Sequence, residues 1–153
     1  MTFTVPLNLP DIQLRCTREE DKIYFFDNFR KKKIMLTPEE WVRQHFAYFL
    51  VNQLHYPKSL IRVESATKFN QLMKRTDIVV YNRSGVADIL VECKSFEAKL
   101  NQSALNQASM YNQSVKARWI VITNGIKHFV FEIDMEKRNY IQANELPSFD
   151  SWS

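Results

Sequence analysis

The sequence predicts an α/β protein in which a mixed β-sheet is flanked by α-helices. Three observations support this fold class. A helix with clear start signals is expected at residues 37–54, a β-hairpin at 76–94 and a strand–helix–strand unit at 86–123. The strand–helix–strand unit implies a parallel pair of strands, and the hairpin adds an antiparallel neighbour, so the sheet must contain both kinds of pairing.

The helix expected at 37–54 has both a start signal and an apolar face. Thr37 can cap its first turn, Pro38 suits the first helical position, and Glu40 completes a capping box. An apolar stripe at helical spacing would face the core, formed by Val42, Phe46, Phe49, Leu50 and Leu54.

Short apolar runs between turn signals indicate the strands. Asn82–Gly85 marks the hairpin turn, and Asn124-Gly125 marks a later one. A second helix is expected at 101–115. The expected strands are 61–64, 76–81, 86–94, 119–123 and 128–133.

Length and composition favour one domain. The 153 residues can bury a core, with an extended region at 1–36, a core at 37–143 and a tail at 144–153. A net charge of +4 permits a nucleic-acid partner without requiring one. Only two glycines occur, which excludes glycine-rich phosphate loops.

The remaining composition predicts a cytoplasmic protein without a membrane partner. Cys16 and Cys93 lie far apart in no metal-ligand spacing, so we expect two reduced thiols. The first residues lack the pattern of a signal peptide, and no run approaches about 18 apolar residues.

Two charged residues interrupt the apolar stretch DILVECKSF at 88–96. Glu92 and Lys94 stand two residues apart, so they share one face of the strand while Cys93 points to the other. Burying a carboxylate and an ammonium group is costly without compensation. A functional site is therefore expected here, with a structural ion pair as the alternative.

A second carboxylate is expected close to this pair. If the hairpin turns at 82–85, Asp77 at the start of the preceding strand lies opposite Leu90 and diagonal to Glu92. Diagonal neighbours on one face are about 7–8 Å apart or less. Asp77, Glu92 and Lys94 can therefore converge near a strand end.

This group of side chains suits a hard divalent cation. Mg²⁺, with Mn²⁺ as a substitute, prefers oxygen ligands, which Asp77, Glu92 and the backbone carbonyl of Cys93 would supply. Lys94 would orient or deprotonate an attacking water, or stabilise charge on a phosphate oxygen. These roles belong to phosphodiester hydrolysis.

The spacing Asp77…Glu92-Cys93-Lys94 resembles the D-(D/E)xK motif of the restriction-endonuclease-like nuclease superfamily. Gln107 and Tyr111 fit the QxxxY motif that accompanies it in RecB-like nucleases and in type I restriction subunits. Nearly the whole chain is similar to the N-terminal domain of those R subunits, as found in small stand-alone bacterial proteins. The matching stretches are FDNFRKKKIMLTPEEWVRQH, RTDIVVYNRSGVADILVECKSF and VITNGIKHFVFEID.

The resemblance implies a restriction-endonuclease-like fold and an Mg²⁺-dependent deoxyribonuclease. Gln107 and Tyr111 would position DNA or support the site; the alternative is a surface glutamine and a core tyrosine. Glu39 would add a carboxylate near the metal, or else serve only as a first-turn acid of the helix. Thr76 departs from the proline often found before the motif aspartate.

DNA and other restriction–modification subunits are the expected partners, and a homodimer is a further alternative. A basic cluster offers phosphate contacts, formed by residues 30–33 with Arg43, Lys68, Lys74 and Arg75. The 153 residues match no part of the helicase motor of R subunits, so ATP-driven translocation is not expected here.

Two other functions fit the same fold. The first is a non-catalytic DNA-binding or assembly module that has lost turnover. The second is a dimeric nuclease similar to Holliday-junction resolvases, which would need a second copy of the chain.

Overall fold

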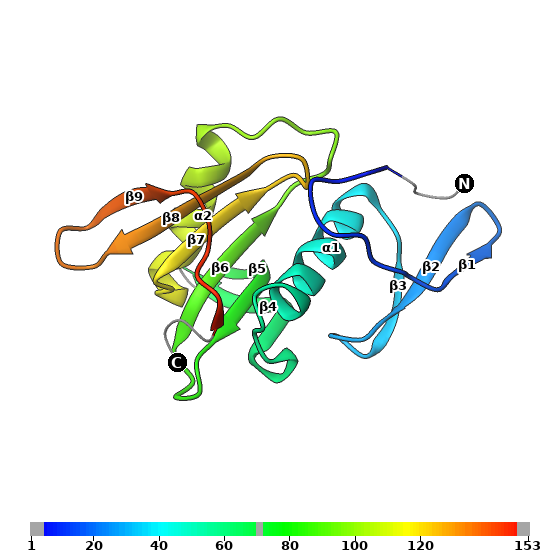
Figure 1. Cartoon of the computed structure of the whole chain (residues 1–153), viewed down its shortest axis with the longest axis horizontal. Coiled ribbons are helices and arrows are strands. Elements are labelled where there is room, and N and C mark those ends of the chain that lie inside the picture. Colours follow the sequence, from blue (N-terminus) through cyan, green and yellow to red (C-terminus); the bar gives the residue numbers. More distant parts are fainter. Residues whose placement is uncertain (1–4, 70–71, 150–153) are drawn as a thin grey trace.

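The computed structural model describes residues 5–69 and 72–149, apart from the side chains of 65–75. Its main sheet has six strands in the order β4-β5-β6-β7-β8-β9 (Figure 1). The strand bounds are β4 Ile61–Phe69, β5 Leu72–Tyr81, β6 Ala87–Cys93, β7 Trp119–Thr123, β8 His128–Asp134 and β9 Asn139–Ala143.

The pairing of these strands confirms the mixed sheet. β6 and β7 are parallel, with helix α2 (Gln102–Val115) between them in the chain. The other neighbouring pairs of the main sheet are antiparallel. The hairpin and the strand–helix–strand unit therefore occur where the sequence predicts them.

The two helices cover opposite faces of this sheet (Figure 1). Helix α1 (Pro38–Asn52) packs on the face that carries Ile78 of β5 and Val91 of β6. Helix α2 packs on the face that carries Val79 and Leu90. Successive side chains of a strand point to opposite faces of the sheet, so these residues show on which face the other residues of β5 and β6 lie.

Helix α1 begins as its sequence predicts, with one difference. The Glu40 N–H donates to Thr37 Oγ1 over 3.1 Å, so Thr37 is the cap. The Glu40 carboxylate instead accepts hydrogen bonds from Arg30 and Arg43. The expected capping box is therefore replaced by an ion-pair network.

The N-terminal region forms more structure than the extended pieces expected from its sequence. Its antiparallel sheet consists of β1 (Cys16–Glu19), β2 (Lys22–Asp27) and β3 (Lys32–Met35). Residues before this sheet attach to the main body, since the Asn8 N–H donates to the Gly125 carbonyl over 2.8 Å. The small sheet lies beside α1 (Figure 1).

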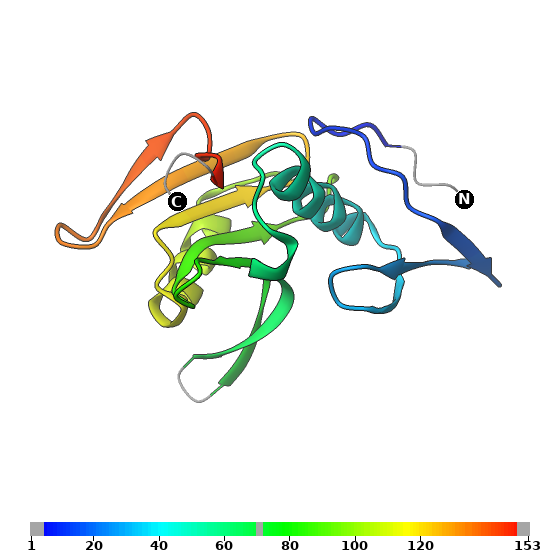
Figure 2. The same ribbon diagram turned by 60° about the horizontal axis from the view of Figure 1, so that its bottom comes forward.

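Three further features differ from the sequence-based expectation. The β4–β5 hairpin is longer than the two strands expected there and bends away from the rest of the sheet (Figure 2). Strand β9 was not expected, because its sequence NYIQA is mostly polar and exposed. The tail packs on the core as far as it is described, with Leu146 buried and the Phe149 N–H donating to the Leu54 carbonyl.

A short 3₁₀ helix, η1 (Lys58–Leu60), leads from α1 into β4. Within the residues that the structure describes, no helix is both long and apolar enough to cross a bilayer.

The surroundings of the two glycines predict that replacing each by alanine lowers the free energy of unfolding by a different amount. Both have positive φ, +80° at Gly85 and +85° at Gly125. A Cβ on Gly125 would lie 2.9 Å from Leu7 Cδ2 and 3.2 Å from Val42 Cγ2, whereas Gly85 faces open space. Gly85→Ala should lower the free energy of unfolding by about 1–2 kcal/mol. Gly125→Ala should cost about 1 kcal/mol more than Gly85→Ala, because the ends of the Leu7 and Val42 side chains must shift to admit the added methyl group.

Urea unfolding of both variants measures these losses. Equal losses at the two positions would show that the close contact between Gly125 and Leu7 has no energetic consequence.

Candidate active site

Strands β5 and β6 separate at the point where the motif residues lie. Ile78 and Val91 form the last pair between these strands, so Asp77 and Glu92 are the next residues beyond it. The expected position of Asp77 opposite Leu90 is therefore wrong, and so is its place at a strand start, since β5 begins at Leu72.

The register differs because of the hairpin turn and a β-bulge beside it. Tyr81 pairs with Ala87 where the expected turn would pair it with Val86, so the turn itself moves the register by one residue. The bulge between Val80 and Tyr81 adds a second, so the total shift is two residues from the expected register. A shift of two residues preserves the face of every side chain, whereas a shift of one would reverse it. Asp77 thus remains on the same face as Glu92.

The side chain of Asp77 takes the place of a strand partner. Its Oδ2 accepts a hydrogen bond from the Cys93 backbone N–H over 2.7 Å. Buried N–H groups need such a partner, and the separating strand no longer supplies a carbonyl. Asp77 is thereby held against the ExK segment.

Glu92 is buried beside Lys94 with one oxygen unpaired. Its Oε1 lies 3.7 Å from Lys94 Nζ, whereas its Oε2 is buried without a hydrogen-bond partner among the described residues. Burial, with the added charges of Asp77 and Glu39, raises the pKa of Glu92 to about 8 although Lys94 opposes the shift. The positive charge of Lys94 therefore does not fully offset the burial of Glu92 and the negative charges around it.

Lys94 is positioned by the two predicted residues of α2. Its Nζ donates to Gln107 Oε1 over 2.9 Å, and Gln107 Nε2 donates to Tyr111 Oη over 2.9 Å. Lys94 itself is only partly buried, with 31 % of its side chain exposed. Gln107 and Tyr111 thus fix the ammonium group in place while it faces solvent.

Helix α1 contributes Glu39 and Arg43 to the same site. Arg43 Nη2 donates to Asp77 Oδ1 over 2.7 Å and to Glu39 Oε1 over 2.9 Å. Burial, followed by the charge of Asp77, raises the pKa of Glu39, while Arg43 and Lys94 act in the opposite direction. Glu39 therefore lies within electrostatic reach of the motif carboxylates, as the sequence predicts.

Glu40 connects this site to the small sheet. Its carboxylate binds Arg43 on one side and Arg30 on the other, and Arg30 also pairs with Asp27 and Glu64. This network was not expected from the sequence. The helical spacing could have predicted only the contacts of Arg43 with Glu39 and Glu40. Residues three and four apart on a helix are neighbours, and Arg43 follows Glu40 by three residues and Glu39 by four.

The network corrects part of the expected phosphate-binding cluster. Arg30 and Arg43 are largely buried in ion pairs, with 8 % and 9 % of their side chains exposed, so neither presents a free guanidinium to a phosphate. Lys68, Lys74 and Arg75 have side chains outside the described part of the structure.

The cysteine of the motif is packed in the core. Cys93 is 1 % exposed among the apolar side chains of the α1 face, and burial raises the pKa of its thiol. The thiol thus points away from Glu92, as expected, and only the backbone of this residue faces the site.

The donor set is compatible with Mg²⁺ but not with a metal held by side chains alone. Within the described residues, no three His, Cys, Asp or Glu side chains form a group that could hold a metal ion. Mg²⁺ commonly binds through one or two carboxylates and keeps several waters. The unpaired oxygen of Glu92 and the nearby Asp77 carboxylate fit such a site.

The fold and this arrangement define an α/β domain of the restriction-endonuclease-like class, in which an acidic residue and an ExK segment meet where two strands separate. The chain belongs to the family described as the type I restriction enzyme R protein N terminus (HSDR_N), whose model matches residues 38–147. The family expected from the sequence is thereby confirmed.

Solved structures provide a further comparison. A fragment of a proposed HsdR subunit of a type I restriction enzyme from Vibrio vulnificus YJ016 shares the fold at a TM-score of 0.54 and 18% identity. The match covers 75% of this chain and 24% of that chain, so the present chain spans about a quarter of it.

A proposed nuclease belonging to DUF820 from Anabaena variabilis ATCC 29413 is more distant. It has a TM-score of 0.47 and 15% identity, with 94% of this chain and 87% of that chain covered. No curated protein matches the chain.

The raised pKa of Glu92 predicts a pH dependence of stability without metal. A carboxyl group whose pKa rises from 4.5 to about 8 on folding stabilises the fold at low pH, and this contribution is lost as the pH rises through that window. In EDTA, wild-type unfolding free energy should fall between these values by a few kcal/mol more than that of Glu92→Gln.

Chemical denaturation at a series of pH values tests this difference. Glu97→Gln, which removes an exposed carboxylate in the following loop, is the matched control and should follow the wild type. Parallel curves for wild type and Glu92→Gln would rule out the electrostatic conflict at Glu92.

Proposed function

We propose that this domain is an Mg²⁺-dependent nuclease that hydrolyses phosphodiester bonds in DNA. The observation that carries the proposal is the meeting of Asp77, Glu92 and Lys94 at the separation of β5 and β6, where Glu92 keeps an unpaired buried oxygen. An unpaired buried acceptor is costly, and a bound cation would relieve that cost at Glu92.

Each side chain has a distinct role in the proposed reaction. Asp77 and Glu92 would hold the cation, together with the backbone carbonyl of Cys93, and Glu39 would add negative charge nearby. When bound, Mg²⁺ supplies Lewis-acid polarisation of a phosphate oxygen. Mn²⁺, which also accepts oxygen ligands, is the expected substitute.

Lys94 would carry the positive charge needed on the other side of the reacting group. Its Nζ can donate to a phosphate oxygen or orient the attacking water, as charge develops in the transition state. Gln107 accepts one of its hydrogen bonds, which limits the directions that the ammonium group can take. We therefore assign Gln107 and Tyr111 a positioning role.

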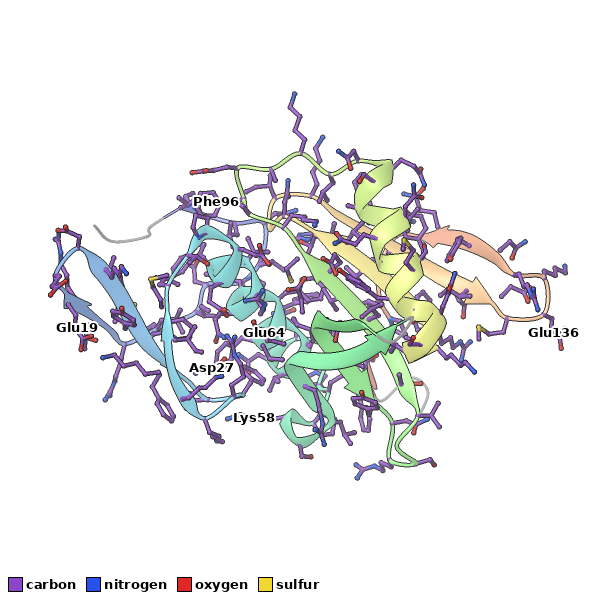
Figure 3. The ribbon with its side chains drawn as sticks, turned by 180° about the vertical axis from the view of Figure 1, so that it is seen from behind. Glu19, Asp27, Lys58, Glu64, Phe96 and Glu136 are labelled. Atoms are coloured by element: carbon purple, nitrogen blue, oxygen red, sulfur yellow. The ribbon has the colours of Figure 1, made fainter. Side chains whose placement is uncertain are left out.

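A basic groove supports DNA as the substrate, and ion pairs from Arg30 through Glu40 to Arg43 link it to the site. It has a volume of about 820 Å³, and none of its lining residues is acidic. Its exposed cations are Lys31, Lys58 and Arg62, and Arg30 forms the wall toward the carboxylate network. In Figure 3, Lys58, Asp27 and Glu64 lie between the small sheet and the β4–β5 hairpin.

The family also suggests partners and a setting for this activity. Other restriction–modification subunits would supply sequence recognition. A cytoplasmic location, where such subunits meet DNA, is part of the same proposal.

Cleavage assays on plasmid and single-stranded DNA test the catalytic assignment. With Mg²⁺ or Mn²⁺, Asp77→Asn, Glu92→Gln and Lys94→Ala should each reduce the cleavage rate by about 100-fold or more, because each removes charge stabilisation from the reacting centre. Gln107→Ala should cost about 10-fold, since Lys94 keeps its charge but loses its orientation.

Lys137→Ala, at an exposed position in the β8–β9 turn, is the control and should cut at the wild-type rate. Equal cutting by wild type and Lys94→Ala would contradict the assignment. DNA binding without any cleavage would favour the non-catalytic module instead.

Charge reversal tests the groove separately from catalysis. In an Asp77→Asn background, Lys58→Glu with Arg62→Glu should weaken binding of a short duplex about 10-fold or more in moderate salt, and should reduce the salt dependence of binding. The matched control is Lys137→Glu with Arg138→Glu, which makes the same charge change in the β8–β9 turn next to Glu136 (Figure 3). Equal losses for the two double variants, measured by fluorescence anisotropy, would place DNA outside the groove.

A further inference from the structure

Arg43 places a buried cation directly against the carboxylates of the proposed metal site. Only 9 % of its side chain is exposed. Nη2 bridges Asp77 Oδ1 at 2.7 Å and Glu39 Oε1 at 2.9 Å, while Nη1 donates to Glu40. One guanidinium group thus contacts three carboxylates.

The charges around Arg43 are not evenly shared. Glu40 has a second cation, because Arg30 Nη2 lies 2.5 Å from its other oxygen. Asp77 and Glu39 each form an ion pair with Arg43. Arg43 therefore chiefly neutralises the two carboxylates that flank the metal position.

This arrangement is not the least costly one for a buried arginine. Its Nε is buried without a hydrogen-bond partner among the described residues, although guanidinium groups normally use all their donors when buried. A buried charge with an unsatisfied donor adds little stability by itself. Its position is better explained by the negative charges of Asp77 and Glu39, which the folded protein brings close together and which Arg43 neutralises.

From these contacts we infer that Arg43 is an internal counter-ion that competes with the divalent cation for Asp77. The inference rests on the proposed function. Without metal, Arg43 holds Asp77 and Glu39 in place; as a divalent cation binds, the guanidinium group gives up its contact with Asp77 Oδ1. Arg43 thereby sets the metal affinity as a positioning residue and contacts no reacting atom.

Binding of Mn²⁺ alone, followed by the loss of the free Mn²⁺ signal in electron paramagnetic resonance, tests this inference without any cleavage assay. Arg43→Gln should bind Mn²⁺ about 10-fold more tightly than wild type, because a like charge within a few ångströms of the cation is removed. Arg43→Lys keeps the charge and should stay within about threefold of wild type.

Two controls separate this inference from the proposed function. Asp77→Asn should lose Mn²⁺ binding, which identifies the site. Arg118→Gln removes one exposed positive charge that pairs with Glu132 and should leave the affinity unchanged. Absence of Mn²⁺ binding by the wild type and by Arg43→Gln would overturn both the metal site and the inference. Binding lost in Asp77→Asn but equal in wild type and Arg43→Gln would overturn the inference alone.

Nuclear magnetic resonance of the wild type covers the case in which Arg43→Gln does not fold. In ¹⁵N-arginine-labelled protein, the Nε–H signal of Arg43, assigned with Arg43→Lys, should shift as Mg²⁺ is added. A signal that stays constant while Mg²⁺ saturates the site would also overturn the inference.

Discussion

A single hydrogen bond, from the Cys93 backbone N–H to the Asp77 carboxylate, organises the centre of this protein. Strands β5 and β6 cease to pair after Ile78 and Val91, which would leave the next backbone groups unsatisfied in a buried place. Asp77 satisfies one of them with a side chain instead of a strand. The opening that results lets charged side chains from α1 reach the same point as Glu92.

The opening brings several carboxylates together in a buried place, and a series of ion pairs neutralises most of their charge. Buried charges are tolerated when they are paired and hydrogen-bonded. The series begins at Arg30, in the turn between β2 and β3, which pairs with Glu40 at the start of α1. Arg43 pairs with Glu40 and also with Asp77 on β5. The small sheet and the main sheet are thus joined through the same charges that surround the candidate site, so its geometry depends on both. Glu92 stands outside this series and keeps its unpaired oxygen.

The parts of this fold that depend on local sequence patterns could be predicted. The Thr37 cap, the strand–helix–strand unit and the shared face of Glu92 and Lys94 follow from residue spacing. The place of Gln107 beside Lys94 followed only from the resemblance to the QxxxY motif. The register of Asp77 could not, because it depends on a bulge beside a turn that the sequence does not mark.

Contacts between residues far apart in the chain could not be predicted from the sequence either. The basic run that contains Arg30 has the appearance of an exposed patch, yet Arg30 is buried between acidic residues from three separate segments. Strand β9 is polar on the surface and is held by pairing with β8, so its own residues give little sign of a strand.

The central claim is that two carboxylates at the separation of β5 and β6 bind a divalent cation. Anomalous diffraction from a wild-type crystal soaked in Mn²⁺ tests it most directly. The account predicts one strong peak between the carboxylates of Asp77 and Glu92, close to the backbone of Cys93. A fully soaked crystal with no peak there, and with Arg43 still bonded to Asp77, would contradict it.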